Sequence, residues 1–495
     1  MSSPGAMHVE LRPGAYADSV TLLQVSRTVQ QIAGVTTAQV AMATTLNLEL
    51  LAQMGFEVPP AASPNDLVVA VRLEDPDVLD GVLAGVDSAL QEVNTPALGT
   101  RDVARPRTTG TALRGGTRAT ALVSVPGANA MVEAMDALDA GCDVMVFSDH
   151  VPVEQEVALK RVASERGLLV MGPDCGTAVV GGVGLGFANV VQPGPVGIVA
   201  ASGTGCQQLL ALLDHAGVGI TCALGVGGRD LSAEVGGSST LTALGRLDAD
   251  PAVELIVLVS KPGADAVART VLARASELTT PVEIALLGPG QPDLTAAAGS
   301  VLARLGRTVP DWPVASPSSA LADVSTHSSS GWLRGLFVGG TLCAEAMLIA
   351  SDRLGPVHSN IALDPDLALD PHHPAPAQHT MLDYGDDALT AGRAHPMIDP
   401  SLRLQHLRQV AADEAAAVIL LDVVLGHGAE PDPAAALGRA IEPIRQPVVV
   451  TVVGTGADPQ DRARQVQRLV AAGAEVHLSN AGATRRAIEL VGAPS

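Results

Sequence analysis

The stretch from Val196 to Cys206, which reads VGIVAASGTGC, decides the fold class of this chain of 495 residues. Its first five residues carry no polar side chain and predict a buried strand, and an apolar stripe typical of a helix follows the Ser-Gly-Thr-Gly turn. A strand, a glycine turn and a helix in direct succession form half of a βαβ unit. The stretch therefore predicts a parallel sheet covered by helices, which is an α/β fold.

The same pattern recurs later in the chain. The stretch 336–343, LFVGGTLC, repeats the strand and the glycine turn, and the Gly-Pro-Gly turn at 288–290 is echoed by Gly-Thr-Gly at 454–456. Repetition of this kind indicates a duplicated supersecondary unit. We therefore expect two flavodoxin-like domains in tandem, over 193–315 and 331–495.

Strands and helices alternate from residue 120 onward. The expected strands, each followed by a helical segment, span 121–125, 144–147, 168–171, 196–200, 255–259 and 282–287. This alternation favours parallel sheets, whose ligands lie beyond the carboxyl ends of the strands. The first units form a partial Rossmann-like domain of the CoA-binding type over 117–192. The segment 356–396 is too long for an ordinary connection, and we expect an active-site insertion or a loose excursion there.

Residues 1–98 form a separate unit in this interpretation. Strands are expected over 9–16, 35–43 and 67–73, and helices over 19–32, 46–54 and 75–93. This order suits a ferredoxin-like or ACT-like module with a regulatory or interfacial role. The segment 101–116 is rich in Arg, Thr, Gly and Pro, and it is expected to be a linker.

Composition and charge exclude several classes of partner. The formal net charge of −22 repels nucleic acid and anionic membranes, and no basic run offsets it. The five cysteines have no CxxC or CxH spacing, so the sequence predicts neither a disulfide framework nor a zinc site. Because there is no signal-like N-terminus and no apolar run of about 18 residues, we expect a cytoplasmic chain without a membrane segment or a bound metal.

The turn from Ser202 through Gly203 and Thr204 to Gly205 is the strongest candidate phosphate site. Glycines at such a turn let backbone N–H groups point at an anion, the hydroxyl groups add donors, and the dipole of the following helix favours negative charge. The alternative is that Ser202 only caps the helix.

Two further turns repeat this chemistry. Gly227, Gly228 and Arg229 follow the next strand and add a cation suited to phosphate or carboxylate, against the alternative of a surface ion pair. The turn from Gly454 through Thr455 to Gly456 precedes a helix expected near residue 460 and repeats the anion cradle. The neighbouring Asp458 opposes a second negative charge at that turn.

Two histidines follow charged or glycine-rich turns. His395 and His427 are candidate general acids or oxyanion donors, against the alternative of solvated loop side chains. The Pro-rich insertion contains three histidines that could form a metal cluster: His372, His373 and His379. The alternative is that this segment is a polar linker. The acidic turn of Asp383, Asp386 and Asp387 is of a kind that holds Mg²⁺, without the fixed spacing of a known motif.

From about Leu122 onward the chain resembles the succinyl-CoA synthetase superfamily, and over its whole length it resembles the FdrA family. Matches to an α-subunit-like part lie at 125–127, 147–149, 171–175, 202–205 and 227–231, and matches to a β-subunit-like part lie at 339–341, 422–426 and 453–456. In the superfamily, two helix N-termini, one from each subunit, face a phosphohistidine. The resemblance carries that role onto 202–205 and 454–456, and it implies substrate contacts at Pro173, Asp174, Gly340 and Thr341.

Three features of the superfamily are absent where the resemblance places them. The segment 288–294 lacks the histidine, the region before Ala121 lacks the glycine loop for CoA, and no segment suits an ATP-grasp domain. We therefore expect phosphate or carbamoyl phosphate as substrate, no firm cofactor, and weak CoA binding.

The FdrA resemblance implies an oxamate carbamoyltransferase subunit in purine and allantoin breakdown, working with two companion subunits. Its reaction converts oxalurate and phosphate into oxamate and carbamoyl phosphate. Ser202 and Thr204 would hold phosphate, Arg229 would neutralise charge, and the carbamoyl carbonyl would be polarised by His395 or His427. Two alternatives stay open: an NDP-forming acyl-CoA ligase with a separate ATP-grasp partner, and a non-catalytic regulatory subunit.

Overall fold

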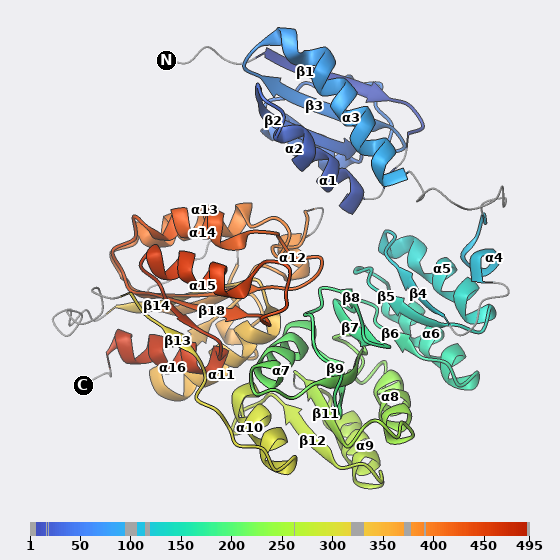
Figure 1. Cartoon of the computed structure of the whole chain (residues 1–495), viewed down its shortest axis with the longest axis vertical. Coiled ribbons are helices and arrows are strands. Elements are labelled where there is room, and N and C mark those ends of the chain that lie inside the picture. Colours follow the sequence, from blue (N-terminus) through green and yellow to red (C-terminus); the bar gives the residue numbers. More distant parts are fainter. Residues whose placement is uncertain are drawn as a thin grey trace. The chain divides into compact units, whose positions relative to one another are not determined.

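The computed structural model describes residues 6–15, 17, 19–94, 106–113, 119–261, 263–317, 331–370, 378–390 and 393–492 (Figure 1). His372 and His373 lie outside these residues. The chain divides into two compact units, Met1–Arg105 and Pro106–Ser495. Within the described ranges, no helix is both long enough and apolar enough for a membrane crossing.

The first unit is a three-stranded antiparallel sheet in the order β1-β3-β2. Its elements are β1 (Ala6–Arg12), α1 (Ser19–Gln30), β2 (Val35–Met42), α2 (Thr45–Gln53), β3 (Leu67–Leu73), the 3₁₀ helix η1 (Pro76–Val78) and α3 (Leu79–Asn94). Because side chains alternate along a strand, Val69 and Val71 pack with α1 and α3, whereas Val68 and Ala70 pack on the other face beside α2. This topology confirms the ferredoxin-like prediction.

The second unit begins with a three-stranded parallel sheet in the order β4-β5-β6. Its elements are α4 (Thr109–Leu113), β4 (Thr120–Val123), α5 (Gly127–Asp139), β5 (Asp143–Val146), α6 (Val153–Glu165) and β6 (Val170–Met171). Part of the segment 101–116, which was predicted to be a linker, is instead helical. Its residues in α4 pack on α5. Strand β4 lies at the edge of this sheet, and no described strand precedes it there.

A six-stranded sheet follows, in the order β12-β11-β9-β10-β7-β8. Its elements are β7 (Thr177–Val180), β8 (Val183–Gly186), β9 (Val196–Ala201), α7 (Gly203–His215), β10 (Ile220–Gly225), α8 (Ser238–Asp248), β11 (Leu255–Ser260), α9 (Asp265–Ser276), β12 (Val282–Leu286) and α10 (Leu294–Arg304). The four strands β9 to β12 are parallel and follow the flavodoxin-like order, as predicted. The antiparallel hairpin β7-β8 extends this sheet and was not predicted.

The last sheet has seven strands in the order β13-β19-β18-β17-β14-β16-β15. Its strands are β13 (Val314–Ala315), β14 (Trp332–Phe337), β15 (Val357–His358), β16 (His379–Asp383), β17 (Ala416–Val424), β18 (Val448–Val453) and β19 (Glu475–His477). Its helical elements are α11 (Gly340–Leu354), η3 (Pro365–Leu367), α12 (Asp387–Thr390), α13 (Ser401–Ala411), α14 (Pro433–Ile441), α15 (Arg462–Ala471) and α16 (Asn480–Val491). The sheet is parallel apart from β13, and the segment 356–396 supplies β15 and β16 of it.

The two large sheets share one apolar core. It combines the buried faces of α7 and α10 from the six-stranded sheet with those of α11 and α16 from the seven-stranded sheet (Figure 1). Helix α7 is buried nearly all round, and Leu209, Leu210, Leu212 and Leu213 are all fully buried, because partners cover it on most sides. This packing fixes the start of α7 against the start of α11.

Candidate active site

The N-termini of α7 and α11 meet at one point of the second unit. The hydroxyl oxygens of Ser202 and Thr341 are 2.6 Å apart and share a hydrogen bond. The backbone of Gly339 comes so close that a Cβ there would lie 2.9 Å from the hydroxyl oxygen of Thr204. The two glycine turns, which lie 139 residues apart in the chain, therefore form a single junction.

Topology explains why these turns meet at a site. In a flavodoxin-like sheet the crevice opens between the first and third strands, where the direction of the connections reverses. Those strands are β9 and β11 in one sheet and β14 and β17 in the other. Ser202 follows β9, Lys261 follows β11 and Gly339 follows β14, so all three lie at the predicted openings.

The start of α11 is held by a buried ion pair. The carboxylate of Asp422 accepts hydrogen bonds from the backbone N–H groups of Val338, at 2.7 Å, and Gly339, at 2.9 Å. It also pairs with Arg403 at 3.0 Å, and both side chains are buried. Burial raises the pKa of Asp422 to about 6, although Arg403 and the two N–H groups oppose that shift.

The two helix starts differ in how they are capped. Ser202 caps α7 by accepting a hydrogen bond from the N–H of Gly205 at 3.0 Å. Gly339 offers α11 no side-chain acceptor, and no described side chain accepts from the N–H groups of its first residues, Gly340 and Thr341. Since orphan N–H groups at a buried helix start require a partner, α11 presents donors for an anion.

Lys261 supplies the charge that such an anion would need. Its side chain is partly buried, and its ammonium group makes no hydrogen bond or ion pair with any residue that the structure describes. A Cβ added at Gly340 would lie 3.2 Å from Nζ of Lys261 and would collide with Oδ2 of Asp383. The ammonium group therefore lies close to Gly340, the first residue of α11. Lys261 is not among the residues that the sequence predicted for this site.

Two carboxyl groups border the junction. Asp383, at the end of β16, is 4% exposed, and burial raises its pKa to about 7, opposed by the charge of Lys261. Asp174 reaches solvent, but partial desolvation and the charges of Asp387 and Asp149 raise its pKa to about 6. Both groups therefore change charge near neutral pH.

The predicted site residues of the α-subunit-like part lie close together in two loops, 173–174 and 227–228. A Cβ at Gly227, whose φ is +90°, would lie 2.5 Å from the carbonyl oxygen of Pro173, and one at Gly228 would lie 4.0 Å from Oδ2 of Asp174. The charge of Lys261 lowers the pKa of Asp174, which places this group near the junction as well. The structure therefore assembles these loops on one side of the site.

Arg229 is already paired. Its guanidinium group binds Glu156 at 3.0 Å and donates to the carbonyl oxygen of Val151 at 2.8 Å. Glu156 belongs to a buried network in which Lys160 binds both Glu156, at 2.8 Å, and Asp230, at 2.7 Å. This geometry matches the ion-pair alternative, and the role of Arg229 toward phosphate stays a prediction.

The two candidate histidines lie in different surroundings. His395 is partly buried, accepts from the N–H of Met397 at Nδ1, and has its Nε2 beside Gly385, two residues beyond Asp383. Burial lowers the pKa of His395 to about 4, so the ring is neutral. His427 is exposed and lies against β8, and no contact among the described residues links it to the junction. The structure therefore favours His395.

The turn at 454–456 differs from its prediction. The helix after it begins at Arg462 rather than near residue 460, with Asp461 as its N-cap. The carboxylate of Asp458 accepts a hydrogen bond from the N–H of Thr455 at 2.7 Å, and it also accepts from the side chain of Asn189 at 2.8 Å. The chain's own carboxylate thus lies where an anion was expected. The helix start that faces α7 is that of α11.

Three exposed side chains near Asp174 resemble a metal cluster. One ligand atom from each of Asp149, His150 and Asp387 lies within 4.8 Å of the others. Asp149 also raises the pKa of His150 through a hydrogen bond at 3.1 Å. Exposed acidic groups often gather in this way without an ion, and no metal role is assigned to them. His379 is structural, since its Nδ1 accepts from the N–H of Leu333 at 3.0 Å.

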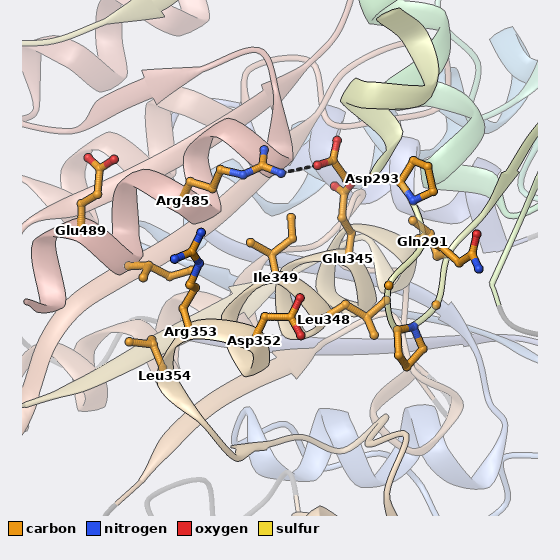
Figure 2. A pocket seen from close by; sticks show the side chains of 16 residues that line it. Gln291, Asp293, Glu345, Leu348, Ile349, Asp352, Arg353, Leu354, Arg485 and Glu489 are labelled. Carbon is orange, nitrogen blue, oxygen red and sulfur yellow. Dashed lines mark hydrogen bonds and ion pairs between the residues drawn. The ribbon is translucent and has the colours of Figure 1, made fainter. Parts of the chain in front are cut away.

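A cavity of about 600 Å³ lies beside the segment 288–293, which follows β12. Figure 2 shows that the loop after β12 lines this cavity together with α11 and α16. Asp293 caps α10 by accepting from the N–H of Ala296 at 2.8 Å and pairs with Arg485. Burial raises the pKa of Glu345 in its wall to about 7. Polar side chains such as Asp293 and Glu345 line the cavity, and no histidine of the described ranges does so.

Two parts of the chain match known protein families. A family model described as "AllF, heavy metal-associated domain" matches residues 3–105, and one described as "CoA-ligase" matches 336–490. The uncharacterised FdrA-like protein YahF of Escherichia coli is 37% identical over 497 residues, which cover 94% of this chain and 95% of YahF. The chain belongs to the FdrA family.

More distant relatives of the family include subunits of CoA ligases. The succinate–CoA ligase alpha subunit of Methanothermobacter thermautotrophicus is 29% identical over 152 residues, and the match covers 30% of this chain and 50% of that subunit. A solved structure of the dinucleotide-forming acetyl-coenzyme A synthetase 1 of Ca. Korarchaeum cryptofilum covers 80% of this chain and 88% of its own, at 15% identity and a TM-score of 0.30. Through the CoA-ligase family model and this alpha subunit, the chain is related to CoA ligases.

Proposed function

We propose that this chain carries out the acyl-phosphate step of an enzyme of the acyl-CoA synthetase type, and that phosphate binds where α7 and α11 meet. One observation carries the proposal. The ammonium group of Lys261, without a partner among the described residues, stands over the uncapped start of α11. A lysine and a helix N-terminus are both ordinary phosphate ligands, and together they favour an anion over any neutral ligand.

The reaction is an acyl transfer to phosphate. A phosphate oxygen attacks the carbonyl carbon of the acyl donor, the bond from that carbon to the leaving group breaks, and the leaving group takes up the proton that phosphate loses. His395 has its proton on Nε2, because Nδ1 accepts from Met397. It is therefore suited to donate a hydrogen bond to the carbonyl oxygen as negative charge develops there.

Two acyl donors fit this step. The CoA-ligase relationship supports a thioester, used with a separate subunit that binds the nucleotide. For that donor, the described part of this chain offers no Rossmann strand ahead of β4 and no glycine loop for CoA, so its residues do not fit a CoA site of the superfamily type. The second donor is oxalurate, which would be used by an oxamate carbamoyltransferase complex with companion subunits, and it is proposed from the FdrA family alone.

One assay distinguishes these donors. The full chain, purified with the subunits that accompany it, is incubated with labelled phosphate and either oxalurate or acyl-CoA with ADP. We expect label to enter an acyl phosphate or a nucleotide with only one of the two donors, and no acid-labile phosphohistidine on this chain. If labelled phosphate is not consumed with either donor, the proposed function is wrong.

Phosphate binding itself is tested at Gly340. We expect Gly340→Ala to weaken phosphate binding roughly tenfold or more, because the new methyl group would displace Asp383 and cover the free N–H groups of α11. Isothermal titration with inorganic phosphate measures this change. Gly245→Ala is the control, since a Cβ in the middle of α8 would meet only the end of the Arg274 side chain, at 4.0 Å. Equal phosphate affinity in both variants would place the site elsewhere.

A further inference from the structure

Asp383 is a buried acid with one free oxygen at the proposed phosphate site. Its Oδ1 accepts a hydrogen bond from the N–H of Gly385 at 2.9 Å. Its Oδ2 has no hydrogen bond or ion pair with any residue in the described ranges, yet it lies against the backbone of Gly340 at the start of α11. Asp383 is 4% exposed and Oδ2 is not completely sealed off from solvent, so this nearly buried oxygen is open to a hydrogen bond with a ligand.

The backbone around Asp383 fixes where that oxygen points. The amide of Asn360 grips the residue from both sides, donating to its carbonyl oxygen at 2.8 Å and accepting from its N–H at 2.9 Å. Strand β16 is paired with β14 on one side and β15 on the other, and Asp383 itself is in register with Phe337 of β14. The backbone therefore holds this carboxyl group beside Gly340, the first residue of α11.

Charged and titratable groups surround Asp383 on every packed element. Lys261 comes from the loop after β11, Asp422 from β17, Cys343 from α11, Asp386 from the following turn, and Nε2 of His395 lies beside Gly385. The lysine favours the carboxylate, whereas Asp422 and Asp386 disfavour it. Burial keeps both Cys343 and His395 uncharged at neutral pH. The protonation state of Asp383 therefore depends on whether an anion also lies beside Lys261.

We propose that Asp383 is the proton-carrying ligand of the bound anion: its protonated Oδ2 donates a hydrogen bond to a tetrahedral oxyanion at the start of α11, and its carboxylate excludes that anion. The inference rests on the phosphate site proposed above, and it states that the site binds an anion only when Asp383 carries a proton. A carboxylate beside a phosphate oxygen would repel it, whereas a carboxylic acid satisfies it. Because burial already raises the pKa of this acid to about 7, the protonated form is populated at neutral pH.

Proton uptake with anion binding follows from this arrangement. Below the pKa of Asp383 the anion binds a site that already holds its proton, and above that pKa each binding event must take one proton from solution. Affinity is therefore constant at low pH and falls about tenfold per pH unit above about pH 7. Phosphate titrates in the same range, so sulfate, which keeps its charge there, is the better probe.

The experiment measures sulfate binding to the full chain by calorimetry between about pH 6 and pH 8.5, in two buffers with different ionisation enthalpies. For the wild type we expect the fall in affinity and the uptake of one proton at the alkaline end. Asp383→Asn should lose the fall in affinity above about pH 7, because its amide donates a hydrogen bond at every pH. Asp366→Asn, an exposed neighbour in the same segment, should keep the wild-type slope.

The outcomes separate this inference from the proposed function. Sulfate binding that Gly340→Ala weakens, but that shows neither a pH slope nor proton uptake in the wild type, would leave the phosphate site standing and overturn the role of Asp383. The same slope in Asp383→Asn would assign the proton to another group. An absence of sulfate binding at every pH would overturn both. Proton uptake is measured on the wild type, so the test survives a variant that fails to fold.

Discussion

Replacing Lys261 by methionine is expected to lower phosphate-dependent turnover about 100-fold or more, which corresponds to the roughly 3 kcal/mol that one preorganised electrostatic donor contributes to a transition state. Methionine keeps the apolar stem of the side chain and removes only the charge. The loss should be large because Lys261 stands over an uncapped helix start and has no partner among the described residues whose removal would offset it. Steady-state kinetics of the complex, followed as acyl phosphate formed, measure the change.

A chemical test locates Lys261 independently of the substrate. Lys160 and Lys261 are the only lysines in the sequence, and Lys160 is fully buried in its ion-pair network. Acetylation of the native chain should therefore modify Lys261 and be slowed by phosphate. Arg353→Met is the matched control for turnover, because Arg353 is an exposed cation that lines the separate cavity (Figure 2). If Arg353→Met and Lys261→Met reduce turnover equally, the charge of Lys261 has no special role.

The fold could be predicted from the sequence because its signals are local. Strand, glycine turn and helix follow one another at 196–213, and the periodicity of each element depends on its own residues. The hairpin β7-β8 escaped prediction because its strands have four residues each and one of them holds two glycines. Strand β16 escaped because Pro and His surround it in the sequence, and only its buried position between β14 and β15 makes it a strand.

The site was harder to predict because its parts meet only in three dimensions. The turn at Ser202 was recognisable, but which turn would face it depended on the packing of α7 against α11. Asp458, two residues after Gly456, indicated in the sequence that a carboxylate of the chain itself would bind the N–H groups of this turn, as it binds that of Thr455. Lys261 carried a usable signal as well, because it directly follows the third strand of a flavodoxin-like unit, where the switch-point rule places ligands.

The largest expected effect on stability is at Asp422. Replacing it with asparagine would leave Arg403 buried without its counter-charge and would weaken the hydrogen bonds that hold Val338 and Gly339. Breaking a buried pair in this way costs about 3–5 kcal/mol, mostly because a charge is left uncompensated in a low dielectric. Scanning calorimetry should therefore show the transition of the second unit at a clearly lower temperature, with that of the ferredoxin-like unit unchanged.

A surface pair provides the contrast for Asp422. Asp432 binds Arg468 at the surface, where water and salt screen the charges, so Asp432→Asn should cost only about 0–1 kcal/mol. Double replacement of Asp422 by Asn and Arg403 by Met should recover much of the stability lost in Asp422→Asn, because no buried charge is then left unpaired. If the single and double variants melt at the same temperature, the cost lies in the hydrogen bonds to Val338 and Gly339, and the start of α11 is set by the carboxylate alone.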